Sequence, residues 1–229
     1  SEKMREIVVS VPVGADKPAI TRTLYATRFG PMLTIPLLGM GWKADKAYAI
    51  RDANYDNDRS LTAWMAIGKA RSVADVKAAV STTLGIPWVN TIAADRAGNA
   101  LHADVTAAPN VSAAKAKACA TPLSAAVAGR FVLLDGRRSA CDWDNTPGTA
   151  APRLLPASEQ AIWERRDYVA NSNDSYWLSN AGAPYRQLSP VLGAWGTART
   201  LRTRSGLVEL ARRFDGSDGL GGRSVDAAK

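Results

Sequence analysis

The chain has 229 residues, of which 46% are hydrophobic and 22% charged, so it can bury a core as one large domain or two small ones. It contains no run of about 18 apolar residues, and the segment from Ser1 to Arg5 lacks the apolar centre of a signal peptide, so no membrane partner is expected. A net charge of +8 would suit nucleic acid, but the basic residues are scattered and do not alternate with aromatic ones, which excludes that partner as well.

Residues 1–105 are predicted to form a sheet and a pair of helices. Extended runs bounded by turn residues lie at 6–11, 23–27 and 46–51, and a tight turn at 28–34 leads into a further extended segment. Ser60 and Ser72 each precede apolar residues at helical spacing, so each is expected to cap a helix.

A strand pair is predicted at 89–94 and 99–105, because the Asp and Gly between them suit a tight antiparallel turn. His102, the only histidine, lies inside the second of these strands. No Gly-x-Ser-x-Gly motif accompanies it, so it is expected to be a packed or surface strand residue and not a catalytic base.

From residue 106 to 166 the composition shifts to Ala, Pro, Ser, Thr and Gly with little periodicity, which predicts a loop-rich excursion with short helical pieces. Cys119 and Cys141 lie in this segment without Cys-x-x-Cys spacing, so a structural zinc site is not expected. From the residues alone, a disulfide and two buried free thiols are both open interpretations of this pair.

The most informative segment runs from residue 167 to 177, where a short apolar run ends in a cluster of amide and hydroxyl side chains. Neutral donors that converge on one point are what a developing oxyanion requires. Asn and Ser also bond their own backbone in ordinary turns, so the residues alone leave both interpretations open.

The densest basic cluster follows in a predicted amphipathic helix, where it is expected to form the solvated face with room for one inward arginine. Its members are Arg199, Arg202, Arg204, Arg212 and Arg213. Residues 167–229 are thus expected to comprise a strand bearing the amide cluster, an arginine-bearing helix and a flexible, turn-rich tail.

Taken together and in order, the motifs of this chain resemble the penicillin amidase family of N-terminal nucleophile hydrolases, in its acyl-homoserine-lactone and aculeacin-type acylase branch. The matching segments are 28–31, 48–54, 85–91, 94–95, 98–101, 134–136, 141–143, 168–178 and 197–204. Each motif is weak alone, but the joint match covers nearly the whole chain.

The resemblance implies an α+β fold that is part of an αββα sandwich, with antiparallel sheets flanked by helices. It implies hydrolysis of the amide bond of acylated substrates such as N-acyl-homoserine lactones, with β-lactam or lipopeptide side chains as alternatives. An N-terminal Ser attacks the carbonyl with its own α-amine as base, so no cofactor is expected. Asn173 matches the family's oxyanion donor, and Arg199 matches the arginine that supports it, while Asn171 and Asp174 are expected to fix the turn.

Further expectations follow from the same resemblance. Trp88 lies where it could line an acyl pocket, although packing in the core is an equal alternative, and Asn90 could contact substrate or only neighbouring backbone. The branch tends to carry a cysteine pair where Cys119 and Cys141 lie, which favours a disulfide and a periplasmic or secreted location. No metal is predicted, since the acid that some calcium-binding relatives carry is not evident near Pro184.

Departures from the family pattern predict that the chain is an internal fragment of the β subunit. Ser1 is followed by Glu2-Lys3 and is not expected to be the nucleophile, so the isolated chain should be catalytically silent. Its expected partners are the remaining β-subunit segments and an α subunit from the same precursor, besides a small acyl amide. A non-catalytic secreted binding domain on the same scaffold is the alternative of another class, against which the presence of Asn173 and Arg199 counts.

Overall fold

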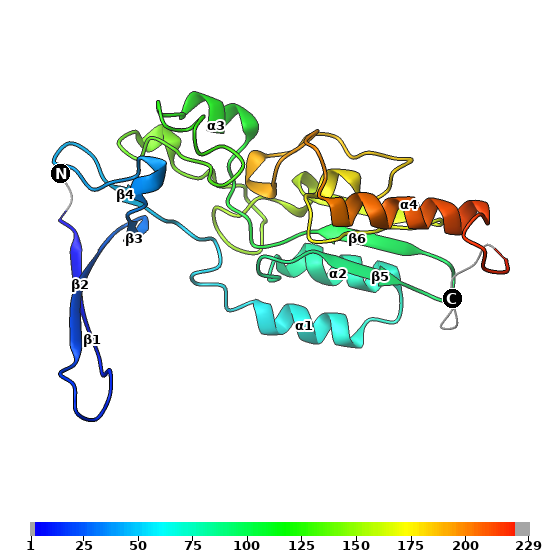
Figure 1. Cartoon of the computed structure of the whole chain (residues 1–229), viewed down its shortest axis with the longest axis horizontal. Coiled ribbons are helices and arrows are strands. Elements are labelled where there is room, and N and C mark those ends of the chain that lie inside the picture. Colours follow the sequence, from blue (N-terminus) through cyan, green and yellow to red (C-terminus); the bar gives the residue numbers. More distant parts are fainter. Residues whose placement is uncertain (1–2, 223–229) are drawn as a thin grey trace.

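The computed structural model describes residues 3–222, so residues 1–2, Ser1 among them, and residues 223–229 lie outside the described part of the chain. It is an α+β protein with antiparallel sheets, as expected (Figure 1). One sheet has the order β1-β2-β3-β4 and comprises Arg5–Val11, Ile20–Thr27, Gly30–Leu33 and Tyr48–Ala49. The other has the order β5-β6-β7 and comprises Thr91–Ala94, Ala100–Asp104 and Ala161–Arg165. The helices are α1 Ser60–Lys69, α2 Val73–Thr83, α3 Ala113–Ala118 and α4 Leu201–Asp215.

The β1–β2 hairpin confirms the first two predicted strands and projects away from the rest of the molecule (Figure 1). Its register pairs Arg5 with Ala26 and Val11 with Ile20. Apolar side chains on it are open to solvent, including Val8 at 67% and Leu24 at 51% exposure. The extended run predicted at 46–51 is a strand only over Tyr48–Ala49.

Two helices cover one face of the β5-β6-β7 sheet. Leu101, Ala103 and Val105 alternate along β6 toward this face and form a buried core with Val76 and Val80 of α2. The alternation places the remaining side chains of β6 on the opposite face, toward residues 167–200. The sheet therefore separates an apolar, helix-covered side from a polar, loop-covered side.

The two predicted helix caps differ. Ser72 has an extended backbone and accepts a hydrogen bond from the Asp75 backbone N–H at 3.1 Å, which confirms it as the cap of α2. Ser60 is wrong as a cap because it is already the first residue of α1. The N-cap position falls on Arg59, whose backbone is itself helical and whose side chain makes no cap bond.

The loop-rich segment predicted for 106–166 contains α3 and three-residue helical turns, but its last residues are regular structure. Strand β7 pairs along β6 from Ala100 opposite Arg165 to Asp104 opposite Ala161. The excursion therefore ends at residue 160. The short strand was missed because its pairing partner lies about sixty residues away and no local signal marks it.

A disulfide joins Cys119 at the end of α3 to Cys141, with 22 residues of sequence separation. Both cysteines are buried. Replacing both with serine is expected to lower the free energy of unfolding by about 3 kcal/mol, since the open loop gains conformational freedom in the unfolded chain. Urea unfolding of the double variant beside the oxidised and reduced wild type tests this. Identical midpoints for the oxidised and reduced wild type would contradict it.

Helix α4 begins after an N-cap at Thr200 and ends at Gly216, which adopts a left-handed backbone with φ 82°. The turns after it fold back, because the buried Arg213 forms an ion pair with Asp218 at 2.9 Å and donates to the Leu220 carbonyl at 3.1 Å. Across residues 3–222 no helix is both long and apolar enough to cross a membrane.

Candidate active site

His102 lies on the polar face of β6 and is fully buried. Its Nδ1 lies 3.3 Å from the Ser179 hydroxyl and its Nε2 lies 3.4 Å from the Asn171 side-chain amide. Burial lowers the pKa of His102 to about 4, so the imidazole is neutral at neutral pH. The histidine is therefore a packed strand residue, as expected, and its contacts hold the segment that follows β7 against the sheet.

That segment is a turn and not the predicted strand. The Asn171 side chain accepts from the Asp174 backbone N–H at 3.2 Å and donates to the Asp174 carbonyl at 2.9 Å. Because these side-chain bonds take the backbone groups that a strand would pair with a neighbour, the chain turns here. The expected role of Asn171 in fixing the turn is confirmed by these contacts.

Asn173 lies at the tip of this turn with φ 56°, in the left-handed region that Asn tolerates better than other side chains. Its side chain is exposed and lines a cavity of about 600 Å³. Within residues 3–222 its amide forms no hydrogen bond, whereas the groups beside it in the turn are bonded to the protein. The turn that carries Asn173 is thus held by its neighbours, and the Asn173 amide is free to donate.

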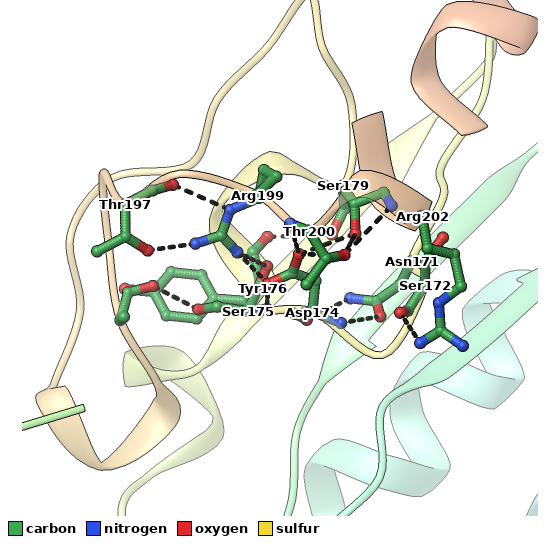
Figure 2. A network of polar contacts seen from close by, with 12 residues as sticks. Asn171, Ser172, Asp174, Ser175, Tyr176, Ser179, Thr197, Arg199, Thr200 and Arg202 are labelled. Atoms are coloured by element: carbon green, nitrogen blue, oxygen red, sulfur yellow. Dashed lines mark hydrogen bonds and ion pairs between the residues drawn. The ribbon is translucent and has the colours of Figure 1, made fainter. Parts of the chain in front are cut away.

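The Asp174 carboxylate ties the turn to α4 (Figure 2). One oxygen accepts from Arg199 Nη1 at 2.6 Å and from the Ser175 backbone N–H at 2.9 Å. The other accepts from the Thr200 backbone N–H at 3.1 Å and from the Thr203 hydroxyl at 2.8 Å. Burial raises the pKa of Asp174, but these hydrogen bonds and the Arg199 charge together outweigh it and leave the pKa below its ordinary value.

Arg199 lies just before α4 and not inside the predicted helix, because Thr200 has an extended backbone and forms the N-cap. The guanidinium is buried, donates to the Thr197 carbonyl at 3.1 Å and lies 5.0 Å from the centre of the Trp177 ring. Among the described contacts none joins Arg199 to Asn173 directly. It supports the asparagine turn through Asp174 (Figure 2).

The cavity brings together three of the residues predicted from the sequence. Trp88, Asn90 and Asn173 all line it. Trp88 is 74% exposed with φ 52°, so core packing does not account for it. The Asn90 side chain makes no hydrogen bond to the described residues and is not occupied by neighbouring backbone. Val191 and Leu192 contribute apolar surface to the same cavity.

Asp104 also lines the cavity, and the sequence analysis missed it. It follows His102 by two residues and so lies on the polar face of β6. Burial raises the pKa of Asp104 to about 6. The available signal was a single acid between Ala103 and Val105 in a strand whose neighbours are apolar.

Asp104 and His102 are expected to give opposite pH dependences of stability. With a raised pKa, folded Asp104 holds a proton that the unfolded chain releases between about pH 4 and 6, so the free energy of unfolding falls with rising pH there. With a lowered pKa, His102 binds its proton only in the unfolded chain between about pH 4 and 6.5, so the same quantity rises.

The wild type should therefore show a nearly flat profile across this window. In Asp104→Asn only the His102 contribution remains, so the free energy of unfolding is expected to rise with pH by up to roughly 3 kcal/mol. In His102→Gln only the Asp104 contribution remains, so the free energy of unfolding is expected to fall with rising pH. Urea midpoints measured at several pH values between about 4 and 7 test both variants. Parallel profiles for wild type and both variants would contradict the assignment.

The described residues show no cluster of three or more His, Cys, Asp or Glu side chains that could hold a metal ion. They bring a neutral amide, a half-buried carboxyl group and an apolar wall together around one cavity. Such a site suits binding of a small molecule with both polar and apolar parts.

The chain belongs to the penicillin amidase family, whose model matches residues 1–218. It is 39% identical to "Aculeacin-A acylase" of Actinoplanes utahensis over 100% of this chain and 29% of that protein. It is 42% identical to "Acyl-homoserine lactone acylase PvdQ" of Pseudomonas fluorescens strain Pf-5 over 84% of this chain and 24% of that protein.

The chain thus spans less than a third of the length of these two curated relatives. Among solved structures, a thermostable penicillin G acylase from Alcaligenes faecalis matches with a TM-score of 0.48 and 14% identity, covering 93% of this chain and 31% of that one. The family resemblance predicted from the motifs is confirmed by the sequence comparisons.

Proposed function

We propose that the protein containing this chain is an acylase that hydrolyses the amide bond of an N-acylated small molecule, with Asn173 as oxyanion donor. The observation that carries the proposal is the Asn173 amide, which lines the cavity and has no bonding partner among residues 3–222. A neutral donor fixed in advance stabilises the charge that develops on a carbonyl oxygen under attack.

The nucleophile is proposed to come from a segment other than the described cavity wall. Ser175 is the serine on that wall, and its hydroxyl donates to the Ala194 carbonyl at 2.5 Å, so its proton is engaged with backbone. An N-terminal serine would supply both nucleophile and base, since an α-amine has a pKa of about 7.7–8.0 and accepts a proton near neutral pH. His102, buried and neutral, is then not needed for proton transfer.

For the substrate we propose an N-acyl-homoserine lactone, with lipopeptide and β-lactam side chains as alternatives. Trp88, Val191 and Leu192 give the cavity an apolar wall for an acyl chain, while Asn90 offers an amide to the polar end. Of the two similar relatives, one is described as an acyl-homoserine lactone acylase and the other as an aculeacin acylase, which supports these candidates.

We further propose that the partners are the remaining β-subunit segments and an α subunit of the same precursor. Large apolar side chains are exposed on the β1–β2 hairpin and on α1, where Leu61 is 68% and Trp64 50% exposed. Such surface is typical of faces that another segment covers. The disulfide supports a periplasmic or secreted location, where disulfides form and persist.

The test is to express the full reading frame that contains this chain and assay three substrates: a long-chain N-acyl-homoserine lactone, an acyl lipopeptide and a chromogenic phenylacetyl amide. Release of the free acid from the lactone in preference to the others is expected. A different preferred substrate would overturn the substrate assignment only. Saturable binding without any acid release would overturn the enzyme assignment and favour a non-catalytic binding domain.

A further inference from the structure

The cavity contains a carboxyl group with no hydrogen-bond donor to serve it. Asp104 is half-buried on β6, a central strand bonded to neighbours on both sides. No hydrogen bond or ion pair within residues 3–222 reaches its side chain. A carboxyl group that is partly removed from water and has no protein donor gains from a donor that a ligand or another segment supplies.

The other polar side chains of the cavity are mostly engaged. The Asp174 carboxylate is saturated by Arg199, Thr200, Thr203 and Ser175. Asp52 accepts from the Asn54 backbone N–H at 2.8 Å.

Arg51 is bound to Asp142, which lies outside the cavity wall. Asp104 is therefore the lining carboxylate with no described protein donor on either oxygen, while Asn90, Asn173 and Arg130 retain donors without a described partner.

We infer that Asp104 is a specificity-determining residue that accepts a hydrogen bond from an N–H group of the bound substrate, and so favours amides over the corresponding esters. This inference rests on the proposed function. An acyl amide presents one carbonyl acceptor and one N–H donor, and the cavity offers unengaged donors, among them the Asn173 amide, and an unengaged carboxylate at Asp104. An ester of the same shape has no N–H and would leave Asp104 without a partner.

The raised pKa of Asp104 is consistent with a carboxyl group that lacks donors in the free protein, since burial is its only cause. Above about pH 7 the group is ionised and accepts strongly, so the measurements are best made there. Tyr176 is a titratable neighbour of Asp104. Burial is the main cause of the raised pKa of Tyr176, and the Asp104 charge raises it further.

The experiment compares a chromogenic acyl amide with the ester of the same acyl chain and leaving-group skeleton, in the full-length protein at about pH 8. The measured quantity is the ratio of kcat/KM for amide to kcat/KM for ester. Dividing the ratio of each variant by that of the wild type cancels the intrinsic reactivity of the ester. Asp104→Leu, which has similar size and no acceptor, is expected to lower the ratio about ten- to hundredfold.

Asp104→Asn keeps an acceptor oxygen but loses the charge, so the ratio should fall only about three- to tenfold. This variant decides the question if Asp104→Leu does not fold. Asp52→Asn is the matched control, because that carboxylate lines the same cavity but already has a protein donor, and its ratio should equal that of the wild type.

A ratio unchanged from wild type in either Asp104 variant would overturn the inference, as would equal losses for amide and ester, which would make Asp104 a structural residue or one bound by another segment. The proposed function would still stand in those cases. If the wild type released no acid from any amide, the proposed function itself would fail, which is a distinct result.

Discussion

Replacing Asn173 with alanine in the full-length protein is expected to lower kcat for acyl amides by about 10²–10³, with KM nearly unchanged. The amide stabilises negative charge that exists only when the carbonyl oxygen becomes an oxyanion, so its loss raises the barrier more than it weakens substrate binding. Steady-state kinetics on one acyl amide over a range of concentrations separate kcat from KM.

The left-handed backbone at Asn173 calls for a second variant. Alanine removes the donor and also strains a residue at φ 56°, whereas glycine removes the donor and adopts this conformation freely. Asn173→Gly should therefore lose as much activity as Asn173→Ala while unfolding at a higher urea concentration. Full activity in the glycine variant would contradict the oxyanion assignment, because only backbone strain would then explain the alanine result.

Replacing Arg199 with methionine should lower the free energy of unfolding by about 3–5 kcal/mol, the usual result of removing one member of a buried ion pair. The Arg199 and Asp174 side chains are 5% and 15% exposed and lie 2.6 Å apart, so solvent cannot replace the lost charge well. Methionine keeps the apolar stem beside Trp177 but none of the donors. Urea unfolding measures the difference.

Arg204→Met is the matched control, since this arginine is on the exposed surface of α4. Its effect should stay within about 0.5 kcal/mol. If Arg199→Met were equally mild, the remaining neutral donors to Asp174 would be sufficient to hold the turn. The described role of the guanidinium would then be wrong.

The sequence was enough to predict those helices and strands that residues close to them in the chain stabilise. The Ser72 cap and the apolar spacing after it predicted α2, and the turn residues Asp95 and Gly98 predicted the β5–β6 hairpin. Strand β7 has the alternation of a strand, with Ala161 and Trp163 buried, but it is short and stabilised by β6, about sixty residues earlier.

The candidate site likewise has a part that the sequence predicted and a part that only the tertiary structure shows. Asn173 and Arg199 were found through a family pattern, yet their connection through Asp174 became visible only once α4 was placed against the turn. Asp104 went unnoticed because nothing adjacent in sequence distinguishes a strand carboxylate that lines a cavity from one that faces solvent. Its importance depends on which donors are missing around it, and that is a property of the tertiary structure.

The β1–β2 hairpin has a consequence for the isolated chain. Among the described residues strand β1 has a neighbour on one side only, so its outer edge offers unpaired backbone groups next to Val9 and Val11. The hairpin lies outside the core, which forms around β6 and α2. An open strand edge of this kind can pair with the same edge of a second molecule, so the chain expressed alone is expected to self-associate through this ribbon.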